Sequence, residues 1–167
     1  MSPMPPNPTY LAKPTLIDLV CVCHALPELE RRQFEALTDG LPFDVDKAAL
    51  MLANLDGPKW ALVTLTGEPL AVGGMHYVRP EVWQEWLIAT DEAWLRHWRA
   101  LTKHCRRIMD RMLETEARRI QCVCLSEKTR ARAWYRVLGF EHEGTLQQYG
   151  ANGEDCEMYA RVARRAE

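Results

Sequence analysis

Residues 81–138 contain neither glycine nor proline, although the 167-residue chain has nine glycines and ten prolines. A loop that holds phosphate on bare backbone N–H groups needs glycine. The gap therefore excludes a Walker-type or dinucleotide-binding loop from the middle of the chain. Gly73-Gly74 is an isolated pair without the further glycines of such loops. A window free of both residues favours uninterrupted helices and buried strands.

Three further features are missing. No apolar run reaches the roughly 18 residues of a membrane-spanning helix. The proline-rich start has no basic segment followed by an apolar one, so we expect a soluble chain that is not secreted. The six cysteines form no C-x-x-C pair, which favours buried or free thiols in a reducing compartment over disulfides or a metal site.

A large net charge is also absent, since 21 basic residues meet 23 acidic ones. The charges are nevertheless unevenly distributed. Residues 1–90 carry six basic and eleven acidic groups, whereas the stretch from Arg96 to Arg136 carries twelve basic and four acidic groups, a local balance of +8. This basic stretch would suit the phosphates of a cofactor, nucleic acid or an acidic protein surface, and a merely solvated helix face explains it equally well.

Proline clusters predict an extended arm over residues 1–14, followed by a single domain over residues 15–167. Hydrophobic periodicity, caps and turn residues divide that domain into helices and strands. Helices are predicted over residues 16–23, 27–37, 45–55 and 128–138, and strands over residues 60–66, 70–77, 82–90, 120–125, 140–146 and 156–162.

The glycine-free window also contains the spacing of one long helix. Apolar residues recur there at intervals of three and four: Trp94, Trp98, Leu101, Cys105, Ile108 and Met112. This spacing predicts a continuous helix of about six turns with one buried face. With the other elements it predicts an α/β fold, a mixed central sheet with helices on both faces.

A helix that contains Ala131 and Tyr135 and ends in Gly139-Phe140, followed by a strand reaching Gly144, resembles the C-terminal motif of GCN5-related N-acetyltransferases (GNATs). The resemblance covers residues 58–163. It implies the GNAT fold, with about six to seven strands, and acetyl-CoA as the cofactor if the chain is active.

The segment that corresponds to that family's glycine loop departs from the pattern. Its nearest frame begins at Arg96, and Arg99 and Leu101 stand at the two small positions, where we expect them to fill the space for pyrophosphate. Lys128 stands where the family usually has asparagine. This degenerate loop is similar to that of acetyltransferase-like internal virion or scaffold-like proteins of short-tailed bacteriophages.

That second resemblance implies a virion-associated or assembly protein that contacts other phage virion proteins, in the virion and in the host bacterial cytoplasm. On this interpretation no cofactor is needed. The alternative is an active acetyl-CoA-dependent N-acetyltransferase.

If the chain is active, the resemblance implies that Tyr135 protonates the departing thiolate, and Glu85 would act as general base for an amine. Arg96, Arg99 and Lys128 would then hold the cofactor. The alternatives are a Tyr135 that only packs on the sheet and a Glu85 that reaches solvent at a strand edge. No metal ligands are expected.

Overall fold

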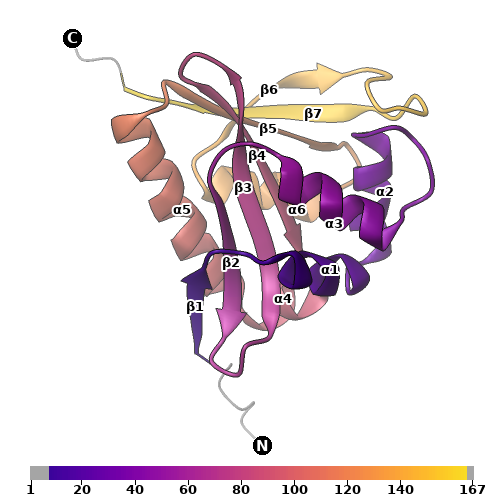
Figure 1. The fold of residues 1–167 in the computed structure, drawn as a ribbon. Helices are drawn as coiled ribbons and strands as arrows, with labels where there is room; N and C mark the ends of the chain where they lie inside the picture. Colours follow the sequence, from indigo (N-terminus) through magenta and orange to yellow (C-terminus); the bar gives the residue numbers. More distant parts are fainter. Residues whose placement is uncertain (1–7, 165–167) are drawn as a thin grey trace, which may run out of the picture.

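The computed structural model describes residues 8–164, in which seven strands form one sheet (Figure 1). Their order is β1-β2-β3-β4-β5-β7-β6, and only the β4–β5 pair is parallel. The bounds are β1 Thr9–Ala12, β2 Lys59–Thr64, β3 Pro69–Arg79, β4 Val82–Ala89, β5 Arg119–Leu125, β6 Glu141–Leu146 and β7 Cys156–Val162. The predicted mixed α/β sheet is confirmed.

Strand β1 lies inside the segment predicted as an arm. It pairs antiparallel with β2, with Thr9 opposite Thr64 and Ala12 opposite Ala61. The chain is extended there, as predicted, but its backbone belongs to the sheet. The sequence did not predict this strand, because only four residues separate Pro8 from the next turn segment. Residues 1–7 of the arm lie outside the described residues.

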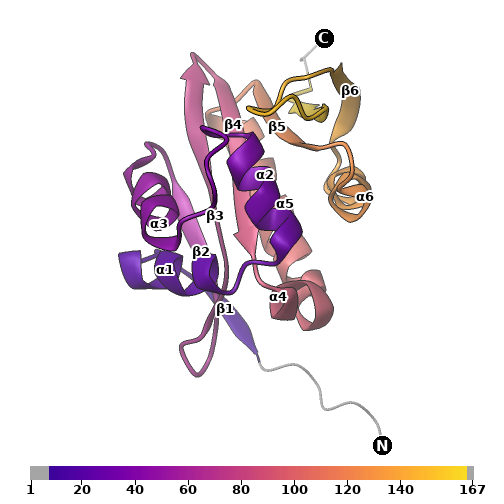
Figure 2. The same ribbon diagram turned by 90° about the vertical axis from the view of Figure 1, so that its right-hand side faces the viewer.

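Three helices cover one face of the sheet: α1 Leu16–His24, α2 Glu28–Ala36 and α3 Val45–Asn54 (Figure 2). Thr15 begins α1 with a capping box, in which its side chain accepts from the Asp18 N–H and Asp18 accepts from the Thr15 N–H. The apolar sides of α1 and α3 pack on alternate residues of β2, β3 and β4, including Ala61, Val72 and Ile88.

The other helices pack on the opposite face: α4 Asp91–Arg96, α5 Trp98–Thr115 and α6 Thr129–Val137. The predicted continuous helix is wrong at His97, which ends the short helix α4 and precedes the first residue of α5. His97 has φ −121°, outside the helical range, so α5 starts anew. Trp98 is consequently 42% exposed, whereas Leu101 and Cys105 face the core as predicted.

Gly73 and Gly74 let two tryptophan rings lie against strand β3. A Cβ on Gly73 would come within 2.4 Å of the Trp60 ring, and a Cβ on Gly74 within 2.7 Å of the Trp86 ring. Gly74 is the cross-strand partner of Trp86. Gly74 therefore makes room for Trp86 on the face that α1–α3 cover, and Gly73 makes room for Trp60 on the opposite face.

Within residues 8–164, no helix combines the length and the apolar character needed to cross a bilayer.

Candidate active site

Strands β4 and β5 are paired along only part of their length. Val82, Trp83 and Gln84 pair with residues of β5, and beyond Gln84 the two strands separate. Each remains held on its outer side, β4 by β3 as far as Ala89 and β5 by β7 as far as Leu125. The sheet is therefore open between β4 and β5, and groups on its two faces meet in this opening.

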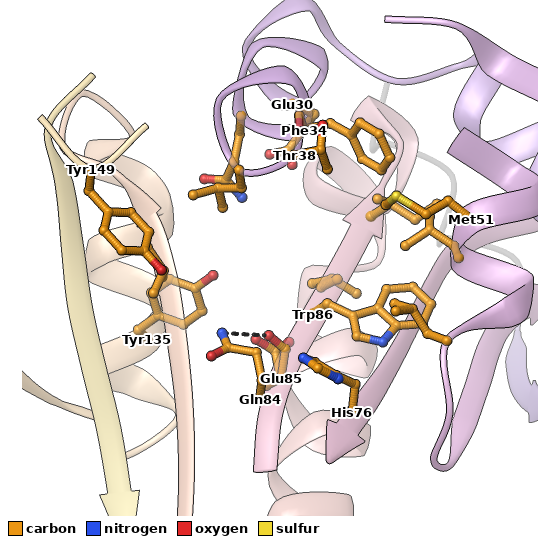
Figure 3. A pocket seen from close by; sticks show the side chains of 17 residues that line it. Glu30, Phe34, Thr38, Met51, His76, Gln84, Glu85, Trp86, Tyr135 and Tyr149 are labelled. Carbon is orange, nitrogen blue, oxygen red and sulfur yellow. Dashed lines mark hydrogen bonds between the residues drawn. The ribbon is translucent and has the colours of Figure 1, made fainter. Parts of the chain in front are cut away.

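A pocket of about 340 Å³ lies at the opening (Figure 3). Its walls come from α2, α3, β3, β4 and β5, and Tyr135 reaches it from α6 on the opposite side of the sheet. Its volume is in the range of small-molecule sites. The strand separation thus brings Glu85 and Tyr135, two of the predicted site residues, to one cavity.

Glu85 is the unusual group in this pocket. Its side chain is 5% exposed, and its Oε1 atom has no hydrogen-bond partner among the described residues. Burial raises the pKa of Glu85 to about 8, although the nearby Lys128 ammonium opposes the shift. The solvent-exposed alternative for Glu85 is therefore wrong. A buried carboxyl that titrates near neutral pH is suited to proton transfer.

Tyr135 is also buried, with its ring 5.7 Å from that of Phe140 and 5.4 Å from that of Tyr159. Burial, followed by the negative potential of Cys122 and Glu85, raises the pKa of Tyr135 well above its ordinary value. The phenol therefore stays protonated at neutral pH. Tyr135 therefore packs in the core, as one alternative predicted. It also lines the pocket, which the predicted acid role requires.

Glu157, unlike Glu85, is a buried carboxylate whose oxygens accept several hydrogen bonds. Although its burial alone would raise the pKa, hydrogen bonds from Ser126, His142 and Thr145 lower it. Glu157 therefore stays charged and ties β5, β6 and β7 together. Within residues 8–164 the Oε1 atom of Glu85 has no donor, so this carboxyl can still accept a hydrogen bond or a proton.

Lys128 begins α6 and pairs with Glu30 of α2 at 2.8 Å, with side chains 7% and 14% exposed. The structure places Lys128 near Glu85, whose pKa it lowers, and not beside Arg96 and Arg99. Two more contacts join α2 to this region. Arg32 pairs with Glu127 at 2.8 Å, and Gln33 accepts from the Leu125 N–H.

Arg96 and Arg99 meet at the start of α5, around a hollow of about 270 Å³. His97 provides no side-chain cap, the first backbone bond of α5 runs from the Leu101 N–H to the His97 carbonyl, and the first turn contains no acidic residue. The exposed N–H groups and the helix dipole make this end suitable for an anion.

The expectation that Leu101 fills the phosphate space is not met, whereas Arg99 does line the hollow. Leu101 is fully buried in the core, and the Arg99 guanidinium lies 4.9 Å from the centre of the Trp98 ring. The hollow at the start of α5 is therefore still present. A glycine in place of Leu101 is therefore not required to keep this helix end accessible, because the Leu101 side chain is buried in the core.

Fewer positive charges between Arg96 and Arg136 are available to a partner than the sequence count suggests. Several basic residues of that stretch pair with carboxylates outside it: Arg96 with Glu92, Arg118 with Glu81, Arg119 with Glu143 and Lys128 with Glu30. Arg106 donates to the Val137 carbonyl at the end of α6. Arg99, Lys103 and Arg107 remain around the exposed Trp98 on α5.

No group of three potential metal ligands occurs within residues 8–164. Cys122 and Cys124 pack in the core on the same strand face as Ile120, as the alternation predicted. Five of the six cysteines are buried, and Cys21 is exposed.

Sequence reasoning missed a polar relay that ends at the pocket. Glu143 accepts from Arg119, whose Nε donates to the Gln121 oxygen at 2.8 Å, and the Gln121 Nε2 donates to the Gln84 oxygen at 3.1 Å. These residues come from three strands. Their contact depends on the register of β4, β5 and β6, which no local sequence signal provides.

The sequence matches no protein-family model and no curated protein. Solved structures, however, resemble nearly the whole chain. A GNAT-family acetyltransferase from Bacillus anthracis is 12% identical and covers 94% of this chain and 96% of its own, with a TM-score of 0.69. An N-acetyltransferase from Staphylococcus aureus Mu50 is 12% identical, with coverage of 95% and 100% and a TM-score of 0.74. The ribosomal-protein-S18-alanine N-acetyltransferase from Escherichia coli is 16% identical, with coverage of 95% and 96% and a TM-score of 0.66.

These likenesses show that the chain has the GNAT fold, which confirms the predicted fold class. At such identities the likeness extends to the fold alone. The three structures carry the names of acetyltransferases and none that of a phage protein, so the expected virion or assembly role gains no support from them.

Proposed function

We propose that this GNAT-fold chain is an acetyl-CoA-dependent N-acetyltransferase. The observation that carries the proposal is that Glu85, a buried carboxyl whose Oε1 has no partner among the described residues, lines the same pocket as Tyr135, where β4 and β5 separate. Perturbed titratable groups gathered in one cavity are typical of catalytic sites.

The two side chains would have complementary roles. The Glu85 carboxylate takes a proton from the ammonium group of the acceptor and leaves a nucleophilic amine. The Tyr135 Oη keeps its proton and is suited to give it to a departing sulfur, because burial disfavours the phenolate. Acetyl-CoA, when bound, supplies the activated acetyl group as a thioester.

The residues present fit acetyl-CoA in two places. The uncapped, acid-free start of α5 with Arg96 and Arg99 suits its phosphates. Beyond Gln84, the β5-facing backbone edge of β4 has no partner in β5 and suits the amide groups of the pantetheine arm. Lys128 is engaged by Glu30, so we assign it to the electrostatics of Glu85 and not to cofactor contact.

Titration calorimetry with acetyl-CoA tests this assignment. We expect micromolar binding by the wild type and a loss of at least tenfold in affinity for Arg99→Glu, because the substitution places a negative charge at the start of α5. Arg107→Glu is the matched control, since Arg107 lies farther along α5 and does not line the hollow. No binding by the wild type, or equal losses in both variants, would contradict the proposal.

A second candidate is the virion-associated role, in which the chain acts through contacts with other virion proteins. The observation that favours it is Trp98, which is 42% exposed and surrounded by Arg99, Lys103 and Arg107. An exposed aromatic among cations is typical of a surface that meets an acidic protein partner or nucleic acid. The same titration separates the candidates, because this role needs no acetyl-CoA.

A further inference from the structure

The ionisable side chains that line the pocket are mostly acidic. Glu30 from α2 and Glu85 from β4 line it, whereas none of its lining residues within residues 8–164 is a lysine or an arginine (Figure 3). His76 of β3 is the one lining side chain there that can gain a positive charge, and its Nδ1 already lies 3.6 Å from the Asp56 carboxylate. A ligand carboxylate or phosphate would therefore find no free cation in this wall.

Cations of the segments that surround the pocket are held by other carboxylates. These pairs are Lys128 with Glu30, Arg32 with Glu127 and Lys47 with Asp39. The Lys128–Glu30 pair is nearly enclosed, with side chains 7% and 14% exposed. Turning Lys128 to a ligand anion would leave the Glu30 carboxylate unpaired in that enclosed place, which is costly.

Glu85 forms no ion pair within the part of the chain that the structure describes, and its Oε1 has no donor there. The ionisable groups near it come from three elements: Cys105 of α5, Cys122 of β5, and Lys128 and Tyr135 at the start and in the middle of α6. Burial raises the pKa of both thiols and of the phenol, so these groups are uncharged at neutral pH. One ammonium thus stands beside two carboxyls, which leaves a place for one more positive charge once Glu85 is ionised.

The rest of the wall combines polar and apolar side chains. Gln33 and Thr38 lie in it together with the aromatic residues Phe34, Trp86 and Tyr149. The faces of aromatic rings attract cations and not anions. Because both polar and apolar groups of a ligand can find a partner in such a wall, we expect it to select by charge and not by polarity.

We propose that the acceptor is an amine that carries no anionic group, and that its ammonium binds in exchange for the Glu85 proton. In this exchange the Glu85 O–H bond breaks, the proton passes to solvent, and the carboxylate pairs with the ammonium. Glu85 is thereby ionised before it acts as the base. The inference deepens the proposed function and rests on it for the role of the bound amine as acceptor, but binding itself needs no acetyl-CoA.

Titration calorimetry at pH 7 without acetyl-CoA compares three probes. L-Leucinamide and L-leucine have nearly the same shape and differ in the charge of the carboxyl group, and 3-methylbutylamine lacks that group. We expect leucinamide and 3-methylbutylamine to bind, and leucine to bind about tenfold more weakly than leucinamide or worse, because nothing in the wall neutralises its carboxylate. Leucine that binds as tightly as leucinamide, or no binding of the two amines at millimolar concentration, overturns the inference.

Proton exchange is measured with 3-methylbutylamine in two buffers that differ in their heat of ionisation. Since the pKa of Glu85 is raised to about 8, its carboxyl is mostly protonated at pH 7. We therefore expect about one proton to be released per amine bound at pH 7, and much less at pH 9. Glu85→Gln should bind the amine more weakly and release no proton, whereas His76→Gln should release it as the wild type does. No release by the wild type, or release that persists in Glu85→Gln, contradicts the exchange.

A cation added to the wall should weaken the selection by charge. Met51 lines the pocket and is 36% exposed, so a lysine can replace it without being buried. We expect Met51→Lys to reduce the preference for leucinamide over leucine about threefold or more. Leu50→Lys is the matched control, because Leu50 precedes Met51 in α3, is more exposed and does not line the pocket. An unchanged preference in Met51→Lys, or the same change in both variants, speaks against selection by the pocket wall.

The failure of this inference is distinguishable from that of the proposed function. If the two amines bind with release of a proton but receive no acetyl group, the proposed function fails and the binding site stands. If leucine and leucinamide are acetylated at equal rates, the proposed function stands and the inference fails.

Discussion

Glu85→Gln is expected to lower the rate of acetyl transfer by about two to three orders of magnitude, the range of a positioned general base. Glutamine has nearly the same shape but cannot take a proton from the acceptor ammonium. The wild-type rate should rise with pH through about 8, where the Glu85 carboxyl ionises. In the variant this rise should be absent. Steady-state rates between pH 6 and pH 9, with binding of the acceptor as the control, measure both effects.

The same substitution has a stability effect of opposite sign. Because burial raises the folded pKa of Glu85 from 4.5 to about 8, the folded state keeps a proton that the unfolded state releases. The protonated carboxyl therefore stabilises the fold fully below pH 4.5, and this contribution is lost as pH rises through about 8. Glutamine cannot ionise, so Glu85→Gln should exceed the wild type in free energy of unfolding at pH 9, by on the order of 4 kcal/mol.

Urea unfolding at pH 5 and pH 9 checks this sign. We expect the two proteins to differ much more at pH 9 than at pH 5. A difference that does not change with pH would mean that Glu85 is ionised in the folded protein, and it would remove the physical basis of the base role.

Lys128→Met is expected to destabilise the protein by up to about 3 kcal/mol, because it leaves the largely enclosed Glu30 carboxylate, 14% exposed, without its cation. It should also move the pH dependence of acetyl transfer to higher pH, since the Lys128 ammonium lowers the pKa of Glu85. Urea unfolding and a pH–rate profile measure the two effects. A merely structural role for Lys128 would change the first and not the second.

Two variants control this prediction. Lys128→Met combined with Glu30→Leu should recover most of the lost stability, because no unpaired charge remains. Arg32→Met breaks the exposed ion pair with Glu127 between the same two segments and should cost less than about 1 kcal/mol. The account of this pair would be wrong if Lys128→Met were as stable as Arg32→Met.

Much of the fold was predictable from local signals. The Thr15 cap begins α1 as expected, and Gly139, with φ 87°, follows the end of α6. The break at His97 was not predictable, because the apolar spacing of Trp94, Trp98 and Leu101 continues across it. The Thr90 cap, which bonds both the Leu70 carbonyl and the Ala93 N–H, marks the start of α4, and only the backbone angle of His97 shows that α4 and α5 are separate.

The sequence predicted two of the residues that line the pocket but not the geometry that brings them together. Glu85 and Tyr135 were candidates, but their meeting depends on the separation of β4 and β5 beyond Gln84, a property of strand pairing. The missing glycines argued against a phosphate site on the assumption that Arg99 and Leu101 fill it, and Arg99 does line the hollow. Leu101 lies in the core instead, because its position on α5 is fixed by helical phase and not by the motif.

The most direct test of the proposed function is mass spectrometry of the products formed from acetyl-CoA and a mixture of primary amines that includes leucinamide, 3-methylbutylamine and spermidine. Wild-type protein and Glu85→Gln are compared between pH 6 and pH 9. We predict an acetylated amine whose rate of formation by the wild type rises through pH about 8, and almost none from Glu85→Gln. No acetylated product from the wild type, or equal rates from the two proteins, would contradict the assignment of this pocket as an acetyl-transfer site.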